Sequence, residues 1–147
     1  MPDRPVRSIL RSRLGPALVS AGPEESVRAA AERMAENRCG SVLVMVGERL
    51  LGIFTERDLL VRVVAPGLDP VATRLGAVMT KYVETIGAGE PVREAVRRMD
   101  EGCFRHLPVV LGTRVVGVLS FRDVPFLELG RMAEELESRH RLAERIW

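Results

Sequence analysis

Apolar residues recur with helical spacing in two segments of the chain. In Val27–Met34, and again in Val92–Met99, they stand at positions i, i+3, i+4 and i+7. Residues at this spacing share one face of an α-helix, so each segment predicts an amphipathic helix with one buried side. Asn37 and Gly102 follow these segments, and both residue types tolerate the left-handed conformation that ends many helices.

Short runs of β-forming residues follow each predicted helix. Val42–Val46 and Leu50–Phe54 lie on either side of Gly47, and two similar runs surround Gly112. Two such runs around a glycine-containing turn predict a β-hairpin. The chain therefore has two predicted helix-hairpin units.

Further elements complete each unit. Ala17–Ser20 and Tyr82–Ile86 predict a short strand before each helix. After each hairpin, Thr55 or Ser120 is followed three positions later by an acidic residue, which is typical of a helix start. The predicted order in both halves is β-α-β-β-α.

The two halves are copies of one unit. A shift of 65 positions aligns Glu25–Asp58 with Glu90–Asp123 without a gap, and 13 of the 34 aligned positions are identical. A unit of this size buries little surface and is only marginally stable alone. We therefore expect a mixed α/β (α+β) fold, with two β-α-β-β-α repeats packed sheet against sheet about a pseudo-two-fold axis. Such an axis creates a cleft between equivalent elements, where ligands often bind.

The same reasoning divides the chain into five parts. Residues 1–16 form an N-terminal segment with a short helix, residues 17–64 form repeat 1, and residues 82–128 form repeat 2. Residues 65–81, which begin with several Pro and Gly, are expected to link the repeats. Residues 129–147 predict a C-terminal helix with a narrow apolar stripe, which we expect to pack against a partner surface.

Composition and charge restrict the class of protein. The chain has 147 residues, of which 46% are hydrophobic, and it carries 22 Lys and Arg against 20 Asp and Glu. The small net charge argues against a nucleic-acid partner. No apolar run reaches the ~18 residues of a membrane span, and the N-terminus lacks the pattern of a secretory signal. Two cysteines do not form a disulfide framework, so a cytoplasmic location is expected.

Several motifs resemble those of one known family. The tandem β-α-β-β-α order, the segments Thr55–Asp58 and Ser120–Asp123, and the segment Arg105–Val110 resemble a cystathionine β-synthase (CBS) domain pair, or Bateman module. The resemblance covers roughly Val6 to Leu129. It implies a regulatory, non-catalytic module that binds AMP, ADP, ATP or S-adenosylmethionine in the cleft between the repeats. It also implies assembly into dimers.

The resemblance assigns roles to four motif residues. Asp58 and Asp123 would hold ribose hydroxyls, and Thr55 and Ser120 would lie near the phosphates. The chemistry is reasonable because a carboxylate accepts two hydroxyl donors and a hydroxyl adds a donor for phosphate. The structural alternative is a capping box, in which the same side chains satisfy backbone groups at a helix start. Both roles can coexist.

A second set of candidates lies before and within the second hairpin. Related modules direct basic residues at the positions of Arg105 and His106 toward phosphate, and the charge of His106 changes near neutral pH. The alternative is a surface-exposed pair. Pro108 completes the motif, whereas copy 1 has Gly40 in place of Arg105 and Leu43 in place of Pro108. The sequence therefore predicts a stronger site in copy 2.

Four other residues have open interpretations. Gly52 and Gly117 interrupt apolar strands and indicate close approach of another segment, with helix packing as the favoured cause. Cys39 and Cys103 are expected to be reduced core thiols, with a redox pair as the alternative.

The leading hypothesis is a homodimeric sensor of adenine nucleotides that acts on a separate effector protein. The alternative is a structural or protein-interaction module without a ligand. An enzyme is not supported, because no nucleophile motif, glycine-rich phosphate loop or metal-ligand set is present in the sequence. No catalytic residue, bound cofactor or metal is therefore expected.

Overall fold

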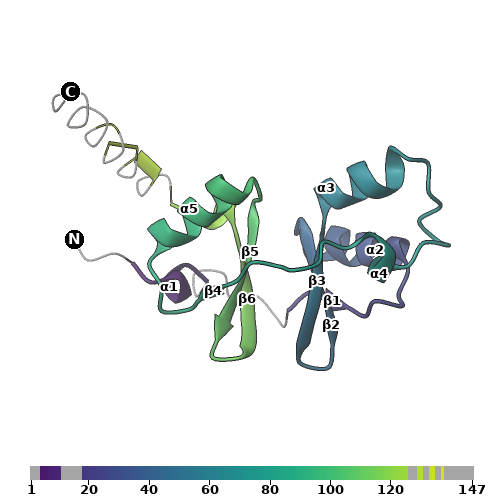
Figure 1. The fold of residues 1–147 in the computed structure, drawn as a ribbon, viewed down its shortest axis with the longest axis horizontal. Coiled ribbons are helices and arrows are strands. Elements are labelled where there is room, and N and C mark those ends of the chain that lie inside the picture. Colours follow the sequence, from purple (N-terminus) through teal and green to yellow (C-terminus); the bar gives the residue numbers. More distant parts are fainter. Residues whose placement is uncertain (1–3, 11–17, 126–128, 131–132, 135–136, 138–147) are drawn as a thin grey trace.

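The computed structural model describes residues 4–10, 18–125, 129–130, 133–134 and 137. Its described part contains two three-stranded sheets with helices on their outer sides (Figure 1). Repeat 1 contains, in chain order, β1 (Ser20–Ala21), α2 (Val27–Asn37), β2 (Ser41–Val46), β3 (Arg49–Thr55), α3 (Glu56–Asp58) and the π-helix η1 (Leu59–Val64).

Repeat 2 has the same order of elements as far as the turn after its hairpin. It contains β4 (Ile86–Gly87), α5 (Val92–Gly102), β5 (His106–Leu111), β6 (Arg114–Ser120) and the 3₁₀ turn η2 (Phe121–Asp123). The 65-residue shift found in the sequence maps α2 onto α5, β2 onto β5 and β3 onto β6 residue for residue. The predicted fold class is thus confirmed, although the helix expected after the second hairpin is a three-residue 3₁₀ turn in the described part of the chain.

Strand pairing is the same in both sheets. β1 runs parallel to β2, and β2 runs antiparallel to β3; β4, β5 and β6 repeat this arrangement. The leading strands are shorter and later than predicted: β1 reaches Ala21, and β4 begins only at Ile86. The segment before Ile86 is irregular because Tyr82 adopts a positive φ of 55°, which an extended strand does not allow.

Each helix ends one residue later than the sequence predicted. The left-handed residues are Arg38 (φ 51°) and Cys103 (φ 54°), rather than Asn37 and Gly102. The backbone N–H of Arg38 donates to the carbonyls near the end of α2, and Cys103 does the same for α5. Closing the helix by these hydrogen bonds compensates for the left-handed backbone of a residue other than glycine.

A half-buried ion pair anchors the leading strand of each repeat to its helix. Arg33 on α2 pairs with Glu25 and donates to the carbonyl of Ser20 at 2.8 Å. In repeat 2, Arg98 pairs with Glu90 at 2.8 Å. The guanidinium holds the pKa of Glu25 below its ordinary value. These pairs explain why Glu and Arg are identical in both copies.

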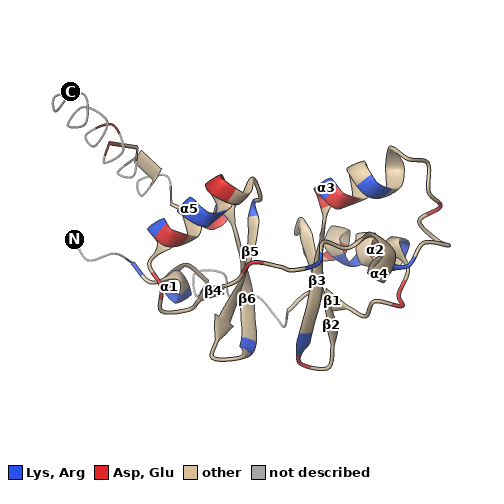
Figure 2. Ribbon diagram, in the orientation of Figure 1, with Lys and Arg blue, Asp and Glu red and all other residues tan. Residues whose placement is uncertain are grey.

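The two repeats meet through their sheets. Leu43 and Ile53 of repeat 1 form a buried cluster with Val115 of repeat 2. Each repeat has a second core between its sheet and its helices. Charged residues gather on the outer helices, whereas the strands are largely uncharged (Figure 2). Apolar burial between the sheets therefore joins the two repeats into one body.

Two short helices are exchanged between the repeats. α1 (Val6–Leu10) precedes repeat 1 but packs on repeat 2, where its first N–H donates to Glu90 O at 2.8 Å. α4 (Leu75–Val78) precedes repeat 2 but packs on repeat 1, where its first N–H donates to Glu25 O at 2.9 Å. Within the described part of the chain, no helix is long and apolar enough to cross a membrane.

The strand glycines allow these exchanged segments to approach, as predicted. A Cβ on Gly52 would lie 2.6 Å from Thr80 O and 2.7 Å from Met79 Sδ, whereas one on Gly117 would lie 3.2 Å from the Leu10 side chain.

We expect Gly52→Ala to lower the free energy of unfolding by about 1–3 kcal/mol, since the backbone must move. Gly117→Ala should lower the free energy of unfolding by less, because the end of the Leu10 side chain can rotate away. Urea denaturation of both variants tests this order, and equal losses would contradict it.

Candidate functional site

Thr55 and Asp58 form a capping box at the start of α3. The Thr55 hydroxyl accepts a hydrogen bond from Asp58 N at 3.2 Å, and Asp58 Oδ2 accepts one from Thr55 N at 3.0 Å. Ser120 and Asp123 repeat the motif, with Ser120 N donating to Asp123 Oδ2 at 2.9 Å. The capping role is present in both copies. A carboxylate offers about four acceptor positions, so this role leaves capacity for a ligand.

Asp58 has two further partners that sequence reasoning missed. The Thr80 hydroxyl lies 3.2 Å from Oδ1 and 3.3 Å from Oδ2 of Asp58, and Arg62 Nε lies 3.6 Å from Oδ1. Asp58 is 8% exposed. Thr80 lies 22 residues from Asp58 along the chain, in the segment between the repeats. This segment lies outside the aligned copies Glu25–Asp58 and Glu90–Asp123, so the comparison of the copies gave no signal for Thr80. Only the folded chain reveals this contact.

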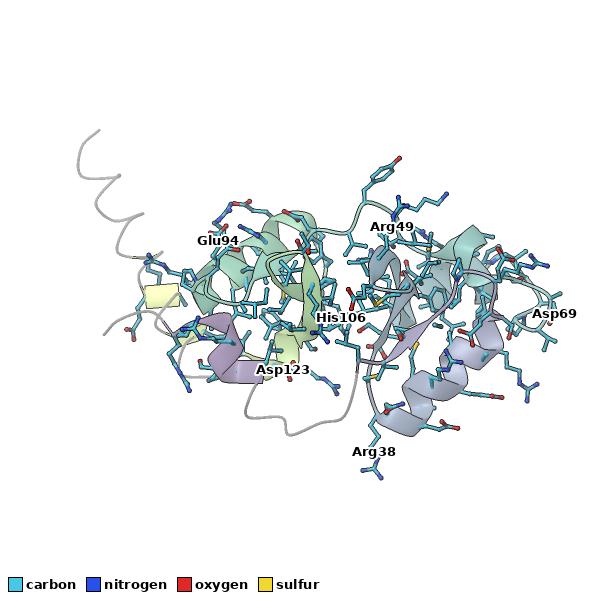
Figure 3. All side chains as sticks on the ribbon, turned by 90° about the horizontal axis from the view of Figure 1, so that it is seen from below. Arg38, Arg49, Asp69, Glu94, His106 and Asp123 are labelled. Carbon is cyan, nitrogen blue, oxygen red and sulfur yellow. The ribbon has the colours of Figure 1, made fainter. Side chains whose placement is uncertain are left out.

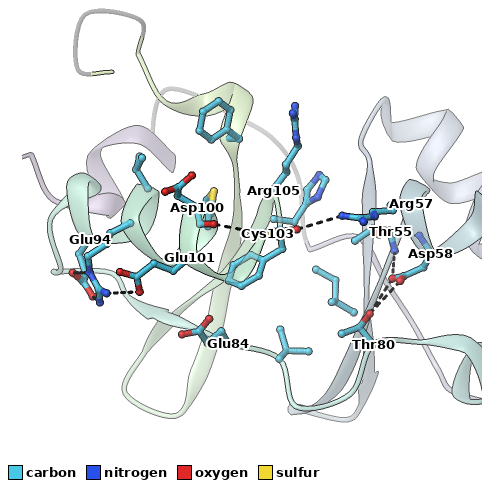
Figure 4. Close-up of a pocket in the computed structure, with 18 of the residues that line it drawn as sticks. Thr55, Arg57, Asp58, Thr80, Glu84, Glu94, Asp100, Glu101, Cys103 and Arg105 are labelled. Carbon is cyan, nitrogen blue, oxygen red and sulfur yellow. Dashed lines mark hydrogen bonds and ion pairs between the residues drawn. The ribbon is translucent and has the colours of Figure 1, made fainter. Parts of the chain in front are cut away.

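A cavity of about 1410 Å³ lies between the two repeats. Thr55, Asp58 and Thr80 line it from repeat 1 and the adjoining segment, and Arg105 and His106 line it from repeat 2 (Figure 4). The structure therefore brings four of the predicted site residues to one cavity. The sequence did not predict that they would come from different copies.

A smaller cleft of about 390 Å³ is the pseudo-symmetric counterpart of this cavity. It is lined by Ser120 from repeat 2 and Arg38 from repeat 1, which the 65-residue shift relates to Thr55 and Cys103 of the larger cavity. Arg105 and His106 also line it. Arg105 and His106 therefore line both cavities, and we call this pair the basic wall.

The structure groups the candidate residues differently from the sequence-based ranking. That ranking assumed that Arg105 and His106 serve the carboxylate of their own copy. In the described part of the chain, neither cavity is lined by Asp123 or Pro108, whereas the larger one is lined by Asp58. Pro108 is buried in β5 opposite Val118. The basic residues of repeat 2 therefore complete a cavity that contains the carboxylate of repeat 1.

His106 lies at the junction of the two repeats (Figure 3). A Cβ on Gly40 would be 3.1 Å from its Nε2 and 3.0 Å from Glu56 Oε1, so both side chains converge on this glycine. Burial holds the pKa of His106 below its ordinary value near 6.5, although Glu56 opposes the shift. At pH 7 its imidazole is neutral. The fixed positive charge on this wall belongs to Arg105, whose guanidinium lies 5.9 Å from the Phe121 ring centroid.

Arg57 spans the gap between the repeats. Its Nη1 donates to Cys103 O at 3.4 Å, at the end of α5 (Figure 4). Acidic residues also line the cavity, among them Glu84 and Asp100. Cys103 is exposed and Cys39 half-buried, and both thiols are free. The expectation of core thiols is therefore wrong for Cys103, because the end of α5 faces the cavity.

The chain matches the CBS domain family twice, over residues 6–65 and 75–124. Each match begins at or beside an exchanged helix, α1 or α4. A CBS domain-containing protein of Arabidopsis thaliana is 34% identical over 146 residues, which are 96% of this chain and 27% of the plant protein. Hypoxic response protein 1 of Mycobacterium tuberculosis is 30% identical over 104 residues, 70% of this chain and 73% of that protein. The chain spans 16–27% of the length of the first three plant relatives.

Solved structures show the same fold. A CBS-domain protein of Burkholderia ambifaria, with a suggested role in signal transduction, is 32% identical with a TM-score of 0.78, over 82% of this chain and 90% of that one. A CBS domain protein of Pyrobaculum aerophilum in complex with AMP is 28% identical with a TM-score of 0.76, over 87% and 99% of the two chains. The repeated sequence, the paired sheets and these matches show that the chain belongs to the CBS domain family and forms a CBS pair, a regulatory module.

Proposed function

We propose that this CBS pair senses an adenosine-containing nucleotide, which binds in the larger cavity between the repeats. One observation carries the proposal: Thr55 and Asp58 of repeat 1 line the same cavity as Arg105 and His106 of repeat 2. The AMP complex of the Pyrobaculum relative supports the ligand class. AMP, ADP, ATP and S-adenosylmethionine all belong to that class.

The cavity supplies complementary chemistry for both ends of a nucleotide. The Asp58 carboxylate accepts hydrogen bonds from the two ribose hydroxyls. The guanidinium groups of Arg57 and Arg105 attract phosphate, and the planar donor fork of Arg favours two parallel hydrogen bonds to it. The neutral imidazole of His106 adds a donor without a charge. The roles proposed for these residues are binding roles, and no catalytic step is proposed.

A melting experiment tests this function directly. A ligand that binds only the folded chain raises its stability by about 2.7 kcal/mol at 100 times Kd, which corresponds to a rise of roughly 5–10 °C in Tm. We expect at least one of AMP, ADP, ATP and S-adenosylmethionine to produce this shift, and GTP to produce little. If none of the four shifts the Tm at millimolar concentration, the proposal is wrong.

The second candidate is an interaction module without a ligand. The hydrogen bond from Arg57 to Cys103 O favours it, because protein groups alone make this contact between the repeats. Under this alternative, none of the four compounds would raise the melting temperature. The same experiment therefore separates the two functions.

We also propose a homodimer that passes its response to a separate effector protein. The outer face of η1 exposes Leu60, Val61 and Val64, which are 60%, 56% and 60% accessible. A patch of this kind on a helix favours self-association about a two-fold axis. The predicted helix at 129–147 lies mostly outside the described residues. A cytoplasmic location stays a prediction from the cysteine content.

A further inference from the structure

The Asp58 carboxylate is held by a hydroxyl from outside its own motif. Thr80 Oγ1 lies within 3.3 Å of both Asp58 oxygens. The backbone of Thr80 is itself fixed, since Thr80 N donates to Ile53 O at 2.8 Å and Ile53 N donates to Thr80 O at 3.0 Å. The position of this hydroxyl is therefore set by strand-like pairing with β3. A side chain on such a backbone restrains its partner with little loss of entropy.

Arg62 is a second partner of the same carboxylate. Arg62 Nε is 3.6 Å from Asp58 Oδ1, and Arg62 Nη1 donates to the carbonyls of Val78 and Met79 at 3.2 and 2.9 Å. Among the described residues that line the larger cavity, Thr80 is present and Arg62 is not. Asp58 Oδ1 therefore contacts Thr80, which lines the cavity, and Arg62, which does not, at the same time. The Thr80 hydroxyl is the contact that holds the carboxylate on the cavity side.

We propose that Thr80 is a positioning residue, which orients the Asp58 carboxylate so that it accepts the ribose hydroxyls of the ligand. The inference rests on the proposed function, because it specifies how that site recognises ribose. Thr55 N occupies one position on Oδ2. The Thr80 hydroxyl, which has one proton to donate, occupies one more of the roughly four acceptor positions. Arg62 Nε, at 3.6 Å from Oδ1, lies beyond hydrogen-bond distance. The remaining positions are therefore available to the two hydroxyls, and their direction depends on Thr80.

Three variants test this role. Thr80→Val removes the hydroxyl but keeps the shape and the backbone pairing, Thr80→Ser keeps the hydroxyl, and Thr113→Val alters an exposed threonine in the turn of the second hairpin. Calorimetric titrations with AMP measure the affinity of each folded variant. We expect Thr80→Val to bind AMP about 3- to 10-fold more weakly. Thr80→Ser and Thr113→Val should remain near the wild-type affinity.

A second ligand separates orientation of the carboxylate from general damage. 2′,3′-Dideoxy-AMP has neither ribose hydroxyl, so Thr80→Val should bind it as the wild-type chain does. Equal losses for AMP and the dideoxy compound would overturn the inference, and so would unchanged or tighter binding of AMP by Thr80→Val. If that variant melts far below the wild type, Thr80→Ala serves in its place. Absence of AMP binding to the wild-type chain would instead overturn the proposed function, and this inference with it.

Discussion

Asp58→Asn is expected to weaken AMP binding about 10- to 150-fold. In the proposed complex the carboxylate accepts hydrogen bonds from two ribose hydroxyls. A hydrogen bond to a charged group contributes about 1.5–3 kcal/mol, and each 1.4 kcal/mol is about tenfold in Kd. The asparagine oxygen can still accept the Thr55 N–H, so the capping box survives in part and the chain should remain folded. Calorimetric titration measures the loss, and a melting scan checks the fold.

Asp123→Asn is the matched control, because Asp123 occupies the equivalent position in repeat 2 and caps η2 in the same way. It does not line the larger cavity, so AMP affinity should change by less than about twofold. The sequence alone predicted the opposite order, with Asp123 the more important carboxylate. A large loss in Asp123→Asn with none in Asp58→Asn would restore that order and contradict the grouping seen in the structure.

The double variant Val61→Glu/Val64→Glu is expected to convert the proposed dimer into a monomer. Both side chains are more than half exposed on η1, so two glutamates are tolerated by the isolated chain. In a dimer they would bury unpaired charge, which costs several kcal/mol. Sedimentation velocity or light scattering at micromolar concentration measures the mass.

Val46→Glu provides a control with the same chemistry. Val46 is 56% exposed, as Val61 is, but it lies at the turn of the first hairpin. This variant should remain dimeric. A monomeric wild-type chain, or a double variant that stays dimeric, would show that the η1 face is not the interface.

Local structure followed closely from the sequence. The apolar spacing placed α2 and α5, and the glycine-centred runs placed both hairpins, because these elements depend on short-range periodicity. The repeat strengthened these predictions, because the same helix and hairpin patterns occur at equivalent positions in both copies. Gly47 and Gly112 adopt φ of 58° and 64°, as their place between paired strands predicts.

Long-range pairing did not follow from the sequence. The exchange of α1 and α4 joins each helix to the repeat that it does not precede, and no periodicity encodes that choice. Thr80 reaches Asp58 only because its backbone pairs with Ile53. The same limit explains the candidate site: the motif residues were identified one by one, but which copy supplies the basic wall depends on how the sheets pack.

A crystal structure of the chain with AMP would show directly whether the nucleotide binds between the repeats. We expect AMP in the larger cavity, with both ribose hydroxyls within hydrogen-bond distance of the Asp58 carboxylate and the phosphate beside Arg105. The Thr80 hydroxyl should remain on Asp58 in that complex. AMP bound only in the smaller cleft beside Ser120, or outside both cavities, would show that the proposed site is wrong.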